Sequence, residues 1–277
     1  MRRLVAVLAI VLVLGAVAAA LVARSSSNAA SPPTTTVRQL RQFRVLFPEG
    51  FTRAKMAARV QAVAKIAVHE SRRKVKLSGD AYLAATKRSR TIPGFGRVKS
   101  LEGFLFPDTY DFDRKTTSAQ LAREQLQEFA ADWQTLNLSY ARSKNLTPYD
   151  VLTIASMVEG EAQAPNERPL VAAVIYNRLH DHMALGIDAT LRYGLHIPPT
   201  KSLSPYLEST NPYNTRKFAG LPPTPINNPG LASLEAAAHP AKVDYLYFVR
   251  KPDHRHHYFT SNYQDFVNHE IQYGYAP

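Results

Sequence analysis

The sequence predicts an α+β fold that follows one membrane-spanning helix. Residues 4–23 form an apolar run without a single charge. Apolar residues at helical spacing dominate 53–183, and short aromatic and aliphatic runs typical of strands lie at 245–249 and 257–260. Because 45% of the 277 residues are hydrophobic, the chain can bury a core and is not mainly disordered.

The apolar run at the N-terminus is long enough to cross a bilayer, since its residues rise about 30 Å as a helix. Arg2 and Arg3 precede it, and the uncharged segment SSSNAASPPTTT follows Arg24. The positive-inside rule predicts a single-pass protein of the cell membrane, with a cytoplasmic N-terminus and an extracytoplasmic body. A cleaved signal peptide is the alternative, although its apolar region is usually shorter. Under both interpretations the part of the chain after the apolar run is exported.

The charge of the chain is strongly positive, with 34 Lys and Arg against 22 Asp and Glu. Three of the arginines fall within residues 1–24, which leaves an excess of nine on the exported part. An exported basic protein is expected to bind anionic lipid headgroups or an anionic wall polymer rather than nucleic acid. The alternative is a merely solvated basic surface. The lack of cysteine excludes disulfides, thiolate catalysis and cysteine-ligated metals.

The composition divides the chain into five segments. Residues 1–24 are the cytoplasmic tip and anchor, and the Ser-, Thr- and Pro-rich residues 25–36 are a flexible stalk. An N-terminal α/β part (37–112), a larger mixed part (113–270) and a tail (271–277) follow. In this division the first part is small and the second carries most of the helices.

The N-terminal part is expected to begin with a short strand and a turn within 44–52 and a basic amphipathic helix over 53–75. A short helix near 80–86 and a loop around Pro93 and Gly94 follow. The segment SLEGFLFPDTYDF (100–112) mixes Gly, Pro and aromatic residues, as cleft-lining stretches often do.

The larger part is expected to open with a long helix over 117–143, in which Trp133 belongs to the core. A second helix over 147–163 and a third over 166–183 follow. The two strands at 245–249 and 257–260 close the list of elements that the pattern predicts.

The helix over 147–163 has the clearest local signals. Thr147 is a good N-cap, Pro148 suits the first helical position, and Asp150 completes a capping box. Apolar side chains cover well over half of its circumference, and a narrow stripe of small residues fills the rest: Thr153, Ser156 and Gly160. A helix that is apolar nearly all round is a buried helix.

Two glutamates, Glu159 and Glu161, end this buried helix. Residues two apart do not face each other, so the pair cannot share one proton as a dyad. A carboxyl group in an apolar setting has a raised pKa and can act as a general acid. The alternative is an ordinary buried glutamate neutralised by Arg168 or Arg178. Periodicity does not choose between the two glutamates.

The segment VEGEA (158–162) resembles the E-x-E motif of the YceG-like, or MltG, endolytic murein transglycosylases. Further segments agree with that family in the same order along the chain: FPEGFT, EGFLFPDTY, NRL, IDATLRYG, PYNT, GLPPTPINNPG, AAAHPAKVDYLYFV and HYFTSN. The resemblance implies that Glu161 is catalytic and that Glu159 supports it. From the pattern of elements we expect a cleft between the small N-terminal part and the larger catalytic part over 113–270. Family members have a single membrane-spanning N-terminus.

Members of this family cleave the bond from N-acetylmuramic acid to N-acetylglucosamine in peptidoglycan and leave a 1,6-anhydro end. The resemblance implies peptidoglycan glycan strands as substrate, association with peptidoglycan synthases, and no cofactor. Larger members carry a LysM-like module after the anchor, whereas about twenty residues precede the first motif here. We therefore expect that module to be missing, and leave open whether the basic helix over 53–75 replaces it.

The expected mechanism needs one carboxyl group. Glu161 protonates the glycosidic oxygen, and its carboxylate then removes the proton from the tethered C6 hydroxyl, which replaces water. Five further residues are expected to bind substrate along with Glu159; they are Asp188, Tyr213, Asn214, His257 and Asn262. Asp188 is expected in a loop-like stretch, and Asn214 has a turn-forming role as its alternative.

The cluster HRHH (254–257) has the alternate histidines of a zinc site, but no acidic or cysteine ligands accompany it. We interpret it as an exposed hairpin loop and expect no metal. Two rival functions remain at this point. One is a true muramidase that uses water, with Glu159 or Asp188 as base; the other is a non-enzymatic wall-binding scaffold.

Overall fold

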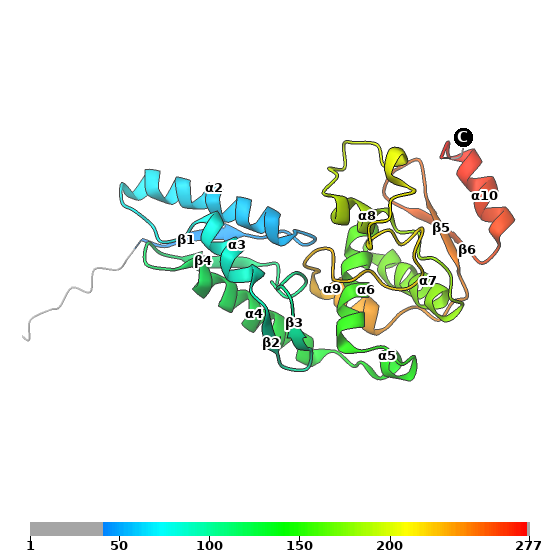
Figure 1. Ribbon diagram of the computed structural model, residues 1–277, viewed down its shortest axis with the longest axis horizontal. Helices are drawn as coiled ribbons and strands as arrows, with labels where there is room; N and C mark the ends of the chain where they lie inside the picture. Colours follow the sequence, from blue (N-terminus) through cyan, green and yellow to red (C-terminus); the bar gives the residue numbers. More distant parts are fainter. Residues whose placement is uncertain (1–40, 276–277) are drawn as a thin grey trace, which may run out of the picture. The chain divides into compact units, whose positions relative to one another are not determined.

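The computed structural model describes residues 41–275, and these belong to a compact unit that covers Leu40–Pro277. The predicted anchor, its alternative as a signal peptide, and the stalk at 25–36 lie outside the described residues. Within residues 41–275, no helix is both long enough and apolar enough to cross a membrane. The α+β class is confirmed, because helices alternate with three separate two-stranded sheets in this part of the chain (Figure 1).

The first sheet pairs strand β1 (Phe43–Leu46) with β4 (Thr109–Phe112), antiparallel, with Val45 opposite Tyr110. Between them in the chain come helix α2 (Arg53–Ser71) and helix α3 (Gly79–Lys87). Thr52 and Ser78 cap the two helices, each accepting a hydrogen bond from a backbone N–H in the first turn.

A β-hairpin follows α3 where a loop was expected, so that expectation is wrong. Strand β2 (Arg90–Ile92) pairs with β3 (Gly96–Val98). Gly94 and Gly96 have φ of 80° and 73°, a conformation that glycine adopts without strain. Each strand has only three residues, too few to produce a recognisable alternation in the sequence.

Helix α4 (Ser118–Thr135) begins at a Thr117–Gln120 capping box and ends eight residues earlier than expected. The short helix α5 (Ser139–Ser143) follows the break. The predicted core position of Trp133 is confirmed, because its ring stacks on Phe129 with centroids 5.5 Å apart.

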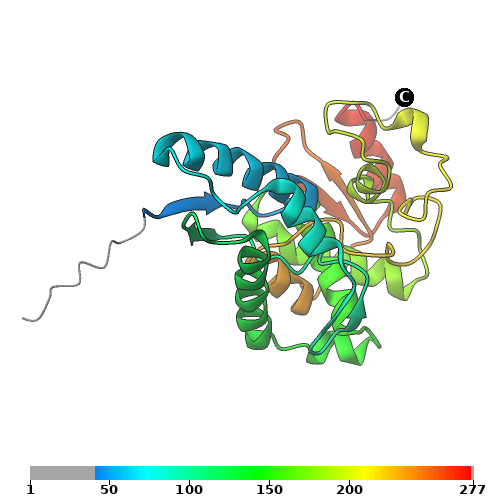
Figure 2. The same ribbon diagram turned by 60° about the vertical axis from the view of Figure 1, so that its left-hand side comes forward.

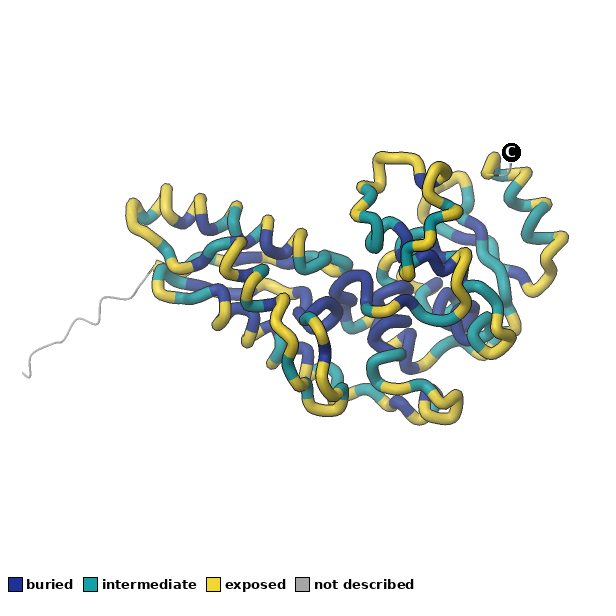
Figure 3. The backbone as a smooth tube through the Cα atoms, viewed as in Figure 1, coloured by how far each residue is buried: buried dark blue, intermediate teal, exposed yellow. Residues whose placement is uncertain are grey.

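Helix α6 (Pro148–Glu161) confirms the predicted helix and its capping box of Thr147 and Asp150. Its residues from Val151 to Val158 are all buried, so the helix is central, as Figure 3 shows. The stripe of small residues on this helix contacts another segment of the chain. Ser156 Oγ accepts a hydrogen bond from the backbone N–H of Ile226 at 3.0 Å, so the loop segment around Ile226 lies against the stripe.

Helix α7 (Arg168–His180) follows a 3₁₀ turn, η1 (Pro165–Glu167). Helix α8 (Asp188–Leu195) begins at Asp188, so the expectation of a loop there is wrong. A second 3₁₀ turn, η2 (Ser204–Tyr206), and helix α9 (Leu231–Ala238) come next; α9 packs against α6.

The C-terminal strands are confirmed as an antiparallel hairpin of β5 (Tyr247–Arg250) and β6 (His257–Thr260), with Arg250 opposite His257. Helix α10 (Tyr263–Gln272) then packs beside both strands (Figure 2). Neither α9 nor α10 was expected from the sequence.

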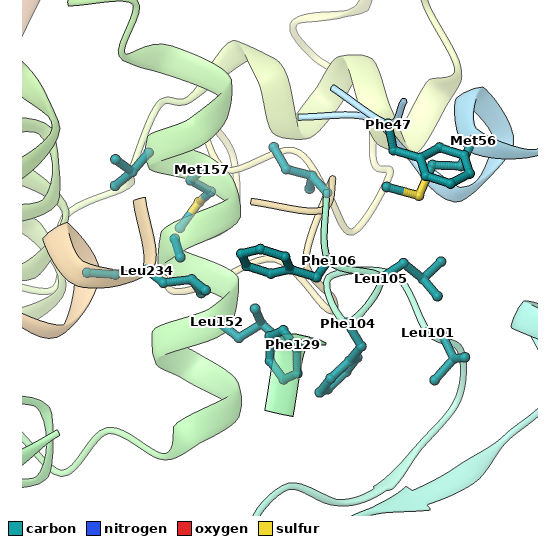
Figure 4. Packing of buried hydrophobic residues seen from close by; sticks show 14 of the residues in the cluster. Phe47, Met56, Leu101, Phe104, Leu105, Phe106, Phe129, Leu152, Met157 and Leu234 are labelled. Atoms are coloured by element: carbon teal, nitrogen blue, oxygen red, sulfur yellow. The ribbon is translucent and has the colours of Figure 1, made fainter. Parts of the chain in front are cut away.

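One hydrophobic core runs through these elements, and Figure 4 shows its centre. Leu152 and Met157 of α6 lie between Leu234 of α9 and the aromatic residues Phe106 and Phe129. Burying side chains of this size stabilises the fold by about 1.5–3 kcal/mol each. The 100–112 segment therefore belongs largely to the core, and Glu102 is a buried acid within it.

Candidate active site

A cleft of about 1460 Å³ lies at the carboxyl end of α6. Its lining comes from both predicted parts of the chain, since Glu49 and Glu102 face it together with Glu159, Glu161 and residues up to Tyr275. The volume exceeds the roughly 300–1,000 Å³ of common small-molecule sites. A cleft of this size suits an extended ligand.

Glu161 is the last residue of α6, and its half-buried side chain lines the cleft. Burial raises the pKa of this carboxyl group above its usual value. The backbone N–H of Ala189, in the first turn of α8, acts in the opposite direction and lowers this pKa. The carboxyl group therefore lies at a helix N-terminus, where its anionic form is stabilised.

Three charged side chains surround Glu161. Arg250 and Arg216 lower its pKa, and Asp188 raises it, all by charge interaction across the cleft wall. Asp188 and Arg216 also form an ion pair at 2.6 Å. The balance leaves the pKa of Glu161 raised, with cations nearby to stabilise the carboxylate after it has given up a proton.

The two arginines offered as neutralising partners of Glu161 are engaged elsewhere. Arg168 Nε donates to Ser233 Oγ at 3.1 Å, and its Nη2 lies 3.8 Å from Glu49. Arg178 donates to the backbone carbonyl groups of Ala184, Leu185 and Leu246. Glu161 is thus not locked to either of them.

Glu159 faces helix α9. Its Oε2 accepts hydrogen bonds from the Gly230 N–H at 3.2 Å and the Ser233 hydroxyl at 2.7 Å. Gly230 is the N-cap of α9 and has no side chain to cap it, so Glu159 supplies the cap from a neighbouring helix. Glu159 also lines the cleft.

Glu102 was not singled out from the sequence, although it lies in a segment that was. It is 4% exposed and lines the cleft. Its Oε1 accepts from the Arg53 N–H at 2.9 Å and from Asn228 Nδ2 at 3.0 Å, and its Oε2 accepts from the Tyr193 hydroxyl at 3.0 Å. Burial raises the pKa of Glu102 to about 7, and these hydrogen bonds oppose the rise.

His257 also lies at the cleft, and it is 4% exposed. Its Nδ1 lies 2.8 Å from Oε2 of Glu167, which is equally buried. The structure therefore brings together four of the predicted site residues, Glu159, Glu161, Asp188 and His257, at one cleft.

The other three predicted site residues do not line this cleft. Asn214 is fully buried, and its amide bonds the backbone carbonyl groups of Leu207 and Ser209, as a turn former does. Tyr213 pairs its hydroxyl with Thr224 at 2.8 Å. Asn262 caps α10 through the Asp265 N–H. Each of these polar groups is used within the fold.

Aromatic side chains from β5 and α10 line another stretch of the cleft. Tyr247 stacks on Phe266 with centroids 5.3 Å apart, and Tyr263 lies 5.6 Å from Tyr247. Flat apolar faces beside polar groups are typical of sugar-binding clefts. The sequence analysis missed this helix, although an N-cap asparagine followed by Tyr263 and Phe266 at i, i+3 spacing could have indicated it.

Two buried polar atoms of the cleft residues have no partner in the part of the chain that the structure describes. They are Nε of Arg53 and Oδ1 of Asn227. The Asn227 amide nitrogen donates to Ser156 O at 2.8 Å, which fixes the orientation of the side chain beside α6. The residues of the cleft wall thus contain one donor and one acceptor without a partner within residues 41–275.

Residues 41–275 contain no group of three or more His, Asp or Glu side chains arranged to hold a metal ion. Residues 254–256 form a loop between β5 and β6, as interpreted from the sequence, but the interpretation is wrong for His257, which is buried at the start of β6. Asp253 accepts from the His256 N–H at 2.9 Å and pairs with its ring at 2.8 Å, so this histidine stabilises the loop.

The fold and the site define an α+β protein with a large cleft, lined by both polar and apolar side chains, at the end of a buried, glutamate-bearing helix. A family comparison assigns the chain directly: the model of the YceG-like family matches residues 23–271. The chain therefore belongs to the YceG-like family.

The relatives agree with this assignment. The chain is 40% identical over 152 residues to the endolytic murein transglycosylase of Bacillus subtilis (strain 168), covering 54% of this chain. It is 32% identical over 241 residues to the endolytic murein transglycosylase of Streptococcus pneumoniae (strain R6), covering 79% of this chain. In both cases the match spans 42% of the relative's length.

A solved structure also resembles the chain. The crystal structure of a putative YceG-like protein from Listeria monocytogenes superimposes with a TM-score of 0.66 at 28% sequence identity. The match covers 81% of this chain and 75% of that one. The fold is therefore shared with a member of the same family.

Proposed function

We propose that this protein is a membrane-anchored, endolytic lytic transglycosylase of peptidoglycan. It cleaves the bond between N-acetylmuramic acid and N-acetylglucosamine in nascent glycan and leaves a 1,6-anhydro end. The observation that carries the proposal is the carboxyl group of Glu161, with a raised pKa, at the wall of a cleft of about 1460 Å³. The relatives named endolytic murein transglycosylases support it.

In the proposed reaction, Glu161 acts first as acid and then as base. Its proton passes to the glycosidic oxygen as the bond from that oxygen to C1 of the muramoyl sugar breaks. The C6 hydroxyl of the same sugar then bonds to C1 and returns its proton to Glu161. Because the hydroxyl is tethered to the reacting sugar, proximity replaces a second carboxylate and water.

The surroundings of Glu161 suit both halves of this cycle. Burial favours the protonated form before the reaction, and Arg250 with the Ala189 N–H stabilises the carboxylate formed in its course. Glu159 is a positioning residue in this proposal, since its carboxylate fixes α9 against α6. Asp188 tunes Glu161 and holds Arg216.

The anchor belongs to the proposal as well. The apolar run at 4–23 and its flanking arginines support a single-pass membrane location with the body outside the cytoplasm. A short connection to the membrane restricts cleavage to glycan near its site of synthesis, and peptidoglycan synthases are the proposed partners.

The decisive test incubates the full chain in detergent with uncrosslinked glycan and analyses the new ends by mass spectrometry. A transglycosylase yields ends lighter by one water than those of a muramidase. Full-mass reducing ends would assign hydrolysis instead, and binding without any product would assign a scaffold role. Glu161→Gln protein is the matched control and should release no product.

A further inference from the structure

A buried acid–imidazole pair lies in the cleft beside the site of Glu161. The ring Nδ1 of His257 lies 2.8 Å from Oε2 of Glu167. The backbone N–H of His257 donates to the same carboxylate, at 3.0 Å to Oε1 and 3.2 Å to Oε2. Glu167 therefore contacts both the ring and the backbone of one residue.

Packing holds this pair in place. Glu167 is 5% exposed and lies in the 3₁₀ turn between α6 and α7, and His257 is 4% exposed at the start of β6. The rings of Phe248 and Phe259 meet the imidazole edge to face, with centroids 5.4 and 6.1 Å away. The ring therefore has little freedom to turn.

The second ring nitrogen, Nε2, has no use within the described part of the protein. No hydrogen bond to it is formed within residues 41–275. Within this part, the side-chain nitrogen and oxygen atoms that are both closed to solvent and without a hydrogen-bond partner belong to Arg53 and Asn227 alone. Nε2 of His257 is not among them, so it keeps access to solvent. Since His257 lines the cleft, that access is through the cleft.

The charges around the ring decide its protonation. Burial lowers the pKa of His257, the cation of Arg250 adds to this, and the carboxylates of Glu167 and Asp253 oppose it. The net direction is downward, so the ring is neutral near pH 7. A neutral imidazole whose Nδ1–H donates to Glu167 has a lone pair on Nε2 and accepts a hydrogen bond there.

We propose that Glu167 is a positioning residue that fixes the tautomer of His257, so that Nε2 accepts a hydrogen bond from a hydroxyl or acetamido N–H of the glycan in the cleft. The proposal rests on the proposed function for the identity of the ligand. The fixed tautomer does not depend on it. Arg250, opposite His257 in the β5–β6 hairpin, is near both this acceptor and Glu161.

The test uses the full chain labelled with ¹⁵N at its histidine rings. Two-bond ¹H–¹⁵N spectra near pH 7 should show His257, assigned from its absence in His257→Phe, as the Nδ1–H tautomer. The Nε2–H tautomer, or a doubly protonated ring, would overturn the proposal. This measurement needs neither substrate nor activity, so its failure is separate from failure of the proposed function.

A second measurement adds an N-acetylglucosamine oligosaccharide as probe. The Nε2 resonance of His257 should shift on binding, and the ring of His256, in the exposed loop, should not. A bound probe with no change at Nε2 would overturn the assigned contact.

In Glu167→Gln the side-chain amide has one acceptor oxygen for two donors, the ring Nδ1–H and the backbone N–H of His257. The Nδ1–H tautomer is therefore fixed less firmly. Activity should fall 10-fold or more in correctly folded protein, with the acid limb of the kcat/KM profile moved to lower pH because a carboxylate that raises the His257 pKa is gone. An unchanged tautomer and pH profile, with activity lost only in proportion to folded protein, would reduce Glu167 to a structural role.

Discussion

The carboxylate of Glu159 accepts a hydrogen bond from the hydroxyl of Ser233 at 2.7 Å. Glu161, two residues on, has no such partner within α9; it meets the first turn of α8 and the cleft. The two glutamates of one short motif thus face different helices, as expected for residues two apart on a helix. One stabilises the packing of α6, and the other is free to exchange a proton.

Replacing Glu159 should therefore affect mainly the stability of the protein, and replacing Glu161 mainly its activity. Glu159→Ala removes the cap of α9 and should lower the free energy of unfolding by about 1–2 kcal/mol. Glu161→Gln should change stability by less and reduce glycan cleavage at least about 100-fold. Urea unfolding and product release on the same samples are the two measurements. Substantial cleavage by Glu161→Gln would remove Glu161 from its proposed role.

The charged neighbours of Glu161 allow a test with opposite signs. A general acid acts while protonated, so kcat/KM falls as the pH rises through the pKa of Glu161. Arg250 lowers this pKa and Asp188 raises it. Arg250→Gln should therefore move the alkaline limb of the pH profile to higher pH, and Asp188→Asn should move it to lower pH. Shifts in the same direction would be inconsistent with Glu161 as the titrating acid.

Glu102 should make the stability of the protein depend on pH. Its pKa is raised from 4.5 to about 7 in the fold, so its stabilising contribution is complete below pH 4.5 and is lost as the pH rises to 7. The difference corresponds to about 3 kcal/mol. Glu102→Gln should reduce the change in the free energy of unfolding between these two pH values by about that amount.

The control for Glu102 is Glu128→Gln, at an exposed position of α4. It should leave the pH dependence of unfolding unchanged. If both variants gave the wild-type curve, Glu102 would be charged in the fold at neutral pH without cost.

The aromatic residues of α10 should contribute to binding more than to chemistry. Tyr263 lines the cleft and is 62% exposed, so its removal should not disturb the core. Tyr263→Ala should raise KM about fivefold, equivalent to about 1 kcal/mol, with little change in kcat. Tyr206→Ala removes an exposed tyrosine outside the cleft lining and should change neither constant. A fall in kcat alone would contradict this assignment.

The sequence predicted α6 well because its signals are local. A capping box, a proline at the first position and apolar residues on nearly every side are all visible within fifteen residues. The place of Glu161 at the end of a buried helix followed directly. The choice of Glu161 over Glu159 came from the family resemblance, and the structure supplies a physical difference between them in the cap of α9.

Other parts of the site could not be predicted because their partners lie far away in the chain. Glu102 becomes a buried acceptor only when Tyr193 and Asn228 reach it, 91 and 126 residues later. Asn214 matched a family motif, yet its amide is used in its own turn. A motif identifies a conserved type of residue but not whether its polar group points into the cleft or back at the backbone.

Asn228 joins segments that lie far apart in the chain. Its Oδ1 accepts from the N–H groups of Gly103 and Leu105, and its Nδ2 donates to Phe51 O, 177 residues earlier. During synthesis, residues 51 and 102–105 emerge long before Asn228 does. The surroundings of Glu102 at the cleft are therefore completed late, because a nascent chain lacks them until Asn228 has emerged.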